Sequence, residues 1–148
     1  MNIPIYFYQI KKHKKTFAIM NDTSIVFGRI LAPYLIASGL GLLISKKFYQ
    51  NQLVNSDKSD PLTVNLSGMI HFFVGITVLN FHFLWNSLLA IIITLLGFSF
   101  VLKGASLIIL PELTLKSGKG SAKYLPFSGA GFILLGVVLG FLSYFSPA

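Results

Sequence analysis

Cysteine is absent from this chain of 148 residues. Without a thiol the protein forms no disulfide, has no cysteine nucleophile and offers no thiolate ligand to a metal. Acidic residues are almost as scarce, since four of them stand against twelve basic residues. The chain therefore has few carboxylates for acid–base or metal chemistry, and its formal charge is +8.

Charge is missing altogether from residues 61–102, a run of 42 positions without Asp, Glu, Lys or Arg. As a single helix this run would measure roughly 63 Å, about twice the ~30 Å hydrocarbon core of a bilayer. It must therefore cross the membrane, turn and cross again. With 54% hydrophobic and only 11% charged residues, the composition also places the chain in the membrane class.

Four apolar segments of spanning length predict an all-α, integral membrane four-helix bundle, with spans at about 25–45, 62–81, 86–110 and 124–144. We expect residues 1–24 to form a basic N-terminal tail and residues 25–148 to form a single four-span domain. Asn21–Ser24 offers several residues that can cap the first span. Polar stretches at 48–61 and 112–123 are predicted to be loops, and an even number of spans places both termini on the same side.

Polar residues interrupt the long apolar run near its middle. Asn80, His82, Trp85 and Asn86 gather there, and tryptophan favours the membrane interface. The group predicts the turn between the second and third spans.

Small residues recur along three of the spans. In the third, Ala90, Gly97 and Gly104 are spaced by seven residues, and in the fourth, Gly136 and Gly140 form a GxxxG pair. The first span has a comparable series, Ala37, Gly41 and Ser45. Close backbone approach through small residues is a main route of helix association in lipid. Internal packing of one bundle is the simpler interpretation, and self-association is the alternative.

His71 lies near the midpoint of the second span, and His82 follows at almost the same helical azimuth. An ionisable residue at bilayer depth is by default a functional hypothesis. Proton relay or metal binding, however, needs further ligands or carboxylates at the same depth, and all four acidic residues lie outside the spans. We interpret His71 as a packing residue, with a proton, metal or ligand role as the alternative.

Lys103 ends the uncharged run at a distance from Trp85 that places it near the far interface, where a lysine side chain can snorkel. The Lys11–Lys15 run could serve nucleic acid, but in a membrane protein each basic residue gains about 1 kcal/mol from anionic lipid. We therefore expect membrane lipids, with anionic headgroups at the lysine clusters, and no nucleic acid as partner. A homo-oligomer or a larger membrane complex is a further possible partner.

No combination of these residues makes a recognisable catalytic site. The Gly118-Lys119-Gly120 segment lacks the Ser or Thr that a Walker motif requires directly after Gly-Lys. Paired intramembrane carboxylates and a nucleophile–base set are also missing. The sequence predicts no catalytic residue, cofactor or metal. The leading interpretation is a non-enzymatic accessory or structural protein, and the alternative is a subunit of a small oligomeric transporter or pore.

Residues 82–111 resemble a family of small, uncharacterised four-helix bacterial inner-membrane proteins. The resemblance is carried by His82-x-x-Trp85, Gly97, Lys103-Gly104 and Pro111. The family pattern has Asn after the His and Trp after the first Gly, whereas this chain has Phe83 and Phe98. The resemblance implies a shape and a location in the inner membrane only.

Basic residues divide unevenly between the two sides of the predicted bundle. Five lie on the N-terminal side: Lys11, Lys12, Lys14, Lys15 and Arg29. Seven lie on the opposite side: Lys46, Lys47, Lys58, Lys103, Lys116, Lys119 and Lys123. Charges close to the spans count most, and the four N-terminal lysines are far from Ile25. The sequence leaves open whether translation starts at Met1 or at Met20, which would remove them. The distribution favours both termini outside and the two lysine-bearing loops in the cytoplasm.

Overall fold

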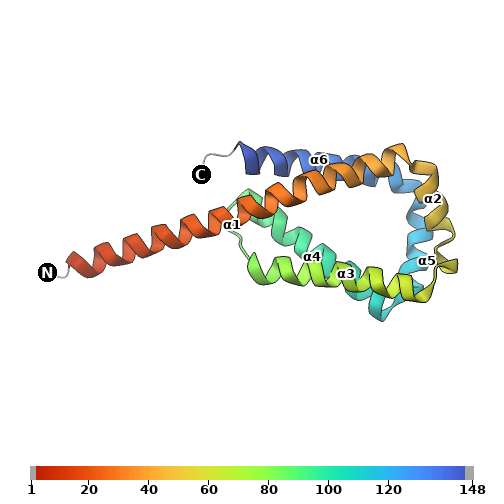
Figure 1. The fold of residues 1–148 in the computed structure, drawn as a ribbon, viewed down its shortest axis with the longest axis horizontal. Coiled ribbons are helices and arrows are strands. Elements are labelled where there is room, and N and C mark those ends of the chain that lie inside the picture. The colour runs from red at the N-terminus through yellow and green to blue at the C-terminus, as the bar shows by residue number, and fades with distance from the viewer. Residues whose placement is uncertain (1–2, 146–148) are drawn as a thin grey trace.

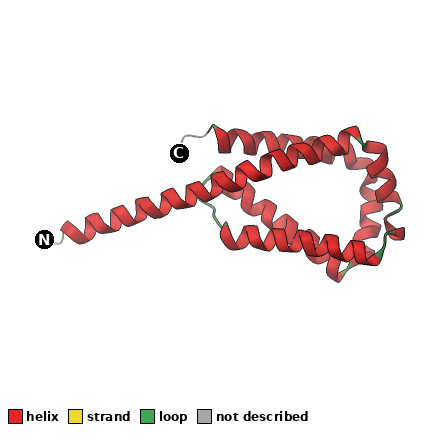
Figure 2. Cartoon of the chain, viewed as in Figure 1, coloured by secondary structure: helices red, strands yellow, loops and turns green. Residues whose placement is uncertain are grey.

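The structure is a computed structural model that describes the backbone of residues 3–145 and the side chains of residues 23–56 and 58–145. The described part of the chain is helical, with short turns and no strand (Figure 2). In chain order the elements are α1 (Ile3–Ile44), α2 (Lys46–Val54), η1 (Ser56–Lys58), α3 (Pro61–Phe81), α4 (Leu88–Ile109), α5 (Pro111–Ser121), η2 (Ala122–Tyr124) and α6 (Leu125–Tyr144).

Four helical stretches are long and apolar enough to cross a membrane: Thr23–Ile44, Pro61–Phe81, Leu88–Ile109 and Pro111–Tyr144. The last of these includes α5 and η2 ahead of α6, and α6 alone has 20 residues, enough for about 30 Å. The predicted all-α fold with four spans is confirmed, and the protein is a multi-pass membrane protein.

The spans are arranged as two antiparallel pairs (Figure 1). The first span, α1, packs along the last, α6, while α3 and α4 form a hairpin between them in the sequence. The two pairs meet near the α3–α4 turn and diverge toward the opposite end, where α2 and α5 run across from one pair to the other (Figure 1). The molecule is therefore closed at one end by direct packing and at the other by two short helices.

Buried apolar side chains from all four spans form the core at the end where the pairs meet. They are Leu31, Ala32, Leu35, Val78, Leu89, Ile93 and Leu139. Because lipid tails are as apolar as these side chains, close packing of matching surfaces supplies much of the attraction between the pairs.

Glycines form the seam within each pair. On α4, Gly97 and Gly104 face α3, and a Cβ at Gly104 would stand 2.7 Å from the Gly68 carbonyl oxygen. On α6, Gly136 lies against α1, and a Cβ at Gly136 would stand 2.9 Å from the Ala32 carbonyl oxygen. A Cβ at Gly140 would make only an ordinary van der Waals contact, at 3.6 Å from Ala32 Cβ. The small-residue stripes of the third and fourth spans thus face partner helices within the chain.

The small-residue series expected on the first span is not the one that α1 uses. Ala37 and Ser45 are exposed, and Gly41 lies near Tyr49 of α2. The residues of α1 that approach α6 are Gly28, Ala32 and Gly39 instead. The predicted series lies on a different side of the helix from the residues that contact α6. Several small residues share this span, and their spacing alone does not say which of them face a partner helix.

The first helix is longer than the sequence indicated. We expected a tail over residues 1–24 and a span from Ile25. The apolar stretch Thr23–Ile44 matches that span, but the helix α1 begins at Ile3 and continues for 42 residues. The expected cap at Asn21–Ser24 is wrong, because these residues lie inside the helix. No glycine or proline occurs between Pro4 and Gly28, so nothing in the sequence stops the helix at the membrane surface.

The two polar stretches predicted as loops contain helices. Residues 48–61 include most of α2 and all of η1, and residues 112–123 include most of α5. Helix α5 has the usual marks of a helix start, with Pro111 at its first turn and Glu112 close behind. Their polarity suggested loops, but both segments also carry apolar residues, a composition typical of helices that lie in the membrane interface.

Candidate functional site

A buried hydrogen-bonded cluster lies where the two helix pairs meet, and His82 is at its centre. His82 is the residue that ends α3, and its backbone N–H donates to the Val78 carbonyl oxygen at 2.7 Å. Its side chain is fully buried, with Nε2 at 2.8 Å from the Ser24 hydroxyl oxygen and the Phe27 ring edge-on at 5.6 Å. One histidine thus ties α1 to the α3–α4 turn.

Thr94 fixes the same turn from α4. Its buried hydroxyl donates toward the carbonyl oxygens of His82 and Leu84, at 3.2 and 3.0 Å, and the Leu84 N–H approaches Thr94 Oγ1 at 3.4 Å. These contacts satisfy backbone groups that a turn at the membrane boundary leaves without helical partners. Trp85 is half exposed in the same turn, with its ring edge-on to Phe83 at 6.0 Å.

One atom of this cluster lacks a partner. His82 Nδ1 is buried and makes no hydrogen bond with any residue in the described part of the chain. Burial removes the ring from water and lowers the pKa of His82 below the ordinary value of 6.5. The ring is therefore neutral at pH 7, and its surroundings are those of a structural contact between helices.

Arg29 closes the same end of the α1–α6 pair. Its Nε donates to the Ser143 carbonyl oxygen at 3.2 Å, and its guanidinium carbon stands 5.2 Å from the centre of the Tyr144 ring. Ser143 is in the last turn of α6, where carbonyl oxygens have no helical donor. Arg29 thus caps the end of α6.

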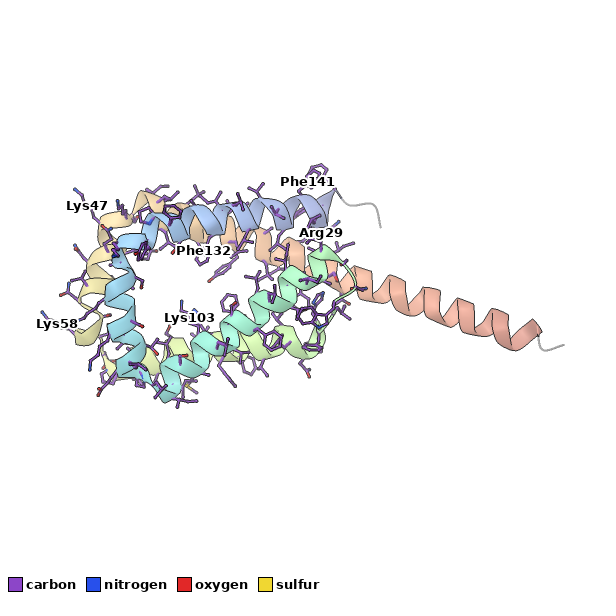
Figure 3. The ribbon with its side chains drawn as sticks, turned by 180° about the vertical axis from the view of Figure 1, so that it is seen from behind. Arg29, Lys47, Lys58, Lys103, Phe132 and Phe141 are labelled. Atoms are coloured by element: carbon purple, nitrogen blue, oxygen red, sulfur yellow. The ribbon has the colours of Figure 1, made fainter. Side chains whose placement is uncertain are left out.

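The second polar location is a pocket between the two pairs, lined by residues from all four spans. Its volume is about 150 Å³, and its polar lining comes from Tyr34 of α1, His71 of α3, and Ser99 and Lys103 of α4. Figure 3 shows Lys103 and Phe132 directed from α4 and α6 into the space between the pairs. The pocket is the place where the fold brings the side chains of His71 and Lys103 together.

No family model, curated protein or solved structure matches this chain. The candidate residues are therefore judged by their place in the structure alone.

The structure separates the candidates into three groups. His71 and Lys103 share the pocket between the pairs. His82 and Trp85 belong to the α3–α4 turn, at the end of α3 that lies far from α2 and α5. The four glycines lie on the helix seams, three of them tightly: Gly97, Gly104 and Gly136, with Gly140 looser. The two histidines, which the sequence placed at one azimuth, therefore belong to different sites, because the chain leaves the helix at His82.

Sequence reasoning missed the partners of these residues. The sequence indicates Ser24 only as one of several possible helix caps, and the pattern of the third span assigns no role to Thr94. One signal could have identified them. Ser and Thr residues that lie on a span at the level of a turn can donate to the backbone groups that the turn leaves unpaired. In the part of the chain that the structure describes, no group of three or more His, Asp or Glu side chains is placed to hold a metal ion.

Proposed function

We propose that the protein is a non-enzymatic accessory or structural protein of the bacterial inner membrane, held against anionic lipid headgroups by a lysine-rich bridge on the cytoplasmic side. The observation that carries the proposal is the bridge itself, formed by α2 and α5 across the ends of the two helix pairs (Figure 1).

Six lysines gather on the bridge and its connecting turns: Lys46, Lys47, Lys58, Lys116, Lys119 and Lys123. All except the half-buried Lys119 are exposed. The acidic residues on the same segments are three: Asp57, Asp60 and Glu112. The bridge thus carries a net positive charge of three, from six lysines minus three carboxylates, at about 1 kcal/mol of attraction per basic residue near an anionic surface.

Side-chain contacts hold the bridge together. Gln50 Nε2 of α2 donates to the Ala122 carbonyl oxygen at 3.3 Å, and the buried Ser56 hydroxyl donates to the Leu115 carbonyl oxygen of α5 at 3.1 Å. The lysines are therefore presented on linked helices, as on an interfacial amphipathic element.

The opposite end is poor in charge among the described side chains. The turn at 82–87 has no charged residue, and Arg29 is engaged by Ser143 and Tyr144. The Lys11–Lys15 side chains lie outside the described part of the chain. By the positive-inside rule, the contrast supports a cytoplasmic location for the bridge. The resemblance of residues 82–111 to small inner-membrane proteins supports the choice of membrane.

The experiment compares lipid retention by wild type and by a variant with Lys116, Lys119 and Lys123 all changed to Gln. Native mass spectrometry of protein released from nanodiscs that contain phosphatidylglycerol and phosphatidylcholine reports the retained lipids. We expect wild type to retain phosphatidylglycerol preferentially and the variant to lose that preference. Equal lipid retention by the two proteins would contradict the proposed lipid contact.

The same spectra and a flux assay separate the accessory role from a transporter or pore. An accessory protein leaves sealed liposomes tight to ions and small solutes. A defined oligomer that makes liposomes permeable in proportion to its amount would replace our proposal with the transport alternative.

A further inference from the structure

We propose that the pocket between the two helix pairs binds the carboxylate end of a single-chain fatty acid that enters sideways from the membrane. The inference concerns a site distinct from the lysine-rich bridge, and it does not require the bridge to bind lipid.

Lys103 is the first reason. It lies six residues before the end of α4, about 9 Å along the helix and therefore inside the span. None of the carboxylates whose side chains are described forms an ion pair with it. The Lys103 side chain is exposed and lines the pocket, and a positive charge at this position either snorkels to the headgroups or pairs with an anion. An anion from outside the chain would supply the missing partner.

The hydrogen-bonding groups of the pocket favour an acceptor as ligand. Besides Lys103, the half-exposed Tyr34 lines the pocket, and its hydroxyl makes no hydrogen bond with another described residue. The Ser99 hydroxyl already donates to the Leu95 carbonyl oxygen at 2.9 Å. Lys103 and Tyr34 are thus free donors, and an ionised carboxylate is a ligand that only accepts.

The ring of His71 lines the same pocket and is held in place by two contacts. Its Nδ1 stands 2.7 Å from the Ser67 carbonyl oxygen, so Nδ1 carries a hydrogen, because a carbonyl oxygen only accepts. The ring also packs on Phe100 at 5.7 Å between ring centres. Nε2 is the nitrogen that remains for a ligand, and it can accept a hydrogen bond from a protonated carboxyl group.

The rest of the pocket is apolar and small. Leu96, Phe100 and Phe132 contribute to its walls, and its volume of about 150 Å³ is below the ~300 Å³ at which sites for drug-sized ligands begin. This space suits a carboxylate and its first methylenes, while the remaining chain would lie among the lipid tails beside the helices.

The position of the bridge favours a fatty acid over a phospholipid as the ligand. Because α2 and α5 cross between the ends of the two pairs, they lie over the membrane-surface side of the space between the pairs (Figure 1). A diacyl phospholipid would have to place a bulky headgroup beneath this cover. A fatty acid brings only a carboxylate, so we commit to the single-chain ligand.

The test uses the full chain in nanodiscs of phosphatidylcholine, with palmitate as the probe. Native mass spectrometry counts bound palmitate, and titration gives the affinity. We expect one palmitate per chain, at least about tenfold weaker binding by Lys103→Met, and near-normal binding by Lys103→Arg. Lys58→Met, which removes an exposed lysine of the bridge, is the matched control and should bind as wild type does.

A second variant guards against a folding defect in Lys103→Met. Leu96→Trp fills the pocket and keeps the lysine, so it should also lose palmitate, and thermal melting of both variants verifies that they are folded. Palmitate affinity that is equal in wild type, Lys103→Met and Leu96→Trp would overturn the proposal. A parallel measurement uses nanodiscs that also contain phosphatidylglycerol. Retention of phosphatidylglycerol that depends on Lys103, without palmitate binding, would also overturn the proposal by assigning the pocket to a phospholipid headgroup.

Discussion

Gly68 of α3 and Gly104 of α4 face each other across the second helix pair, each within reach of the other's backbone. A Cβ on Gly104 would stand 2.7 Å from the Gly68 carbonyl oxygen, and a Cβ on Gly68 would stand 3.2 Å from that of Gly104. The added carbon on Gly104 would also meet the backbone of Phe72. Backbone atoms cannot move aside as a flexible side chain can, so this crossing requires a residue without a side chain.

Gly104→Ala should therefore destabilise the protein by about 1–3 kcal/mol, the usual cost of overpacking. Thermal unfolding in one detergent, by near-UV circular dichroism, measures the loss. Gly131→Ala is the matched control on α6, since a Cβ there meets nothing within 4 Å. A Gly104→Ala melting temperature equal to that of the control would show that α3 and α4 are not packed in this way.

Of the two glycines in the GxxxG pair on α6, only Gly136 should be sensitive to substitution by alanine. A Cβ at Gly136 would meet Ile36 Cγ1 at 2.7 Å and the Ala32 oxygen at 2.9 Å, whereas a Cβ at Gly140 would meet only Ala32 Cβ, at 3.6 Å. We expect Gly136→Ala to cost about 1–3 kcal/mol and Gly140→Ala to stay within about 0.5 kcal/mol of wild type. Comparable losses in the two variants would instead indicate that both glycines serve an interface between copies of the chain.

His82 should make stability depend on pH. Burial lowers its pKa in the folded protein below the ordinary 6.5, so the unfolded chain takes up a proton first as the pH falls. The stability contributed by the neutral ring is complete above pH 6.5 and is lost as the pH falls from there toward the folded-state pKa. Within that window each pH unit costs at most about 1.4 kcal/mol.

Thermal melts between pH 7.5 and 5 test this dependence. His82→Gln removes the titrating group and should flatten the loss, while His71→Gln, in the other histidine site, should leave it unchanged. If the slope persists in His82→Gln and vanishes in His71→Gln, the titrating group has been assigned to the wrong histidine.

The spans were readable from the sequence because the bilayer imposes one strong requirement, a long apolar helix. Predicted spans two to four match α3, α4 and α6 within two residues at each end. The one difference is that the apolar helical stretch Pro111–Tyr144 includes α5 and η2 as well as α6. The helices α2 and α5 were not readable, since an interfacial helix mixes lysines with apolar residues as an exposed loop does.

The sequence did not indicate which helices pack against each other. Spacing identified Gly97, Gly104 and Gly136, but it could not tell that the first span pairs with the last. For the same reason, no local pattern joins Ser24 to His82, 58 residues away, or His71 to Lys103 in one pocket. These contacts depend on how the two pairs converge, and nothing local in the sequence encodes that.

Orientation is the last prediction, and it concerns the ends of the spans. The α3–α4 turn and the end of α6 lie at one end of the four-span bundle, and the lysine-rich bridge lies at the other (Figure 1). Because the four N-terminal lysines precede Thr23 by eight residues or more along α1, we expect the bridge lysines, which adjoin the spans, to dominate the positive-inside balance. Alkaline phosphatase fused after Ala148 should then be active, and a fluorescent protein fused there should be dark. Moving each reporter to the α2–η1 region, at Asn55, should reverse both results. A fluorescent, phosphatase-negative C-terminus would mean that the Lys11–Lys15 run governs insertion and that the bridge faces outward.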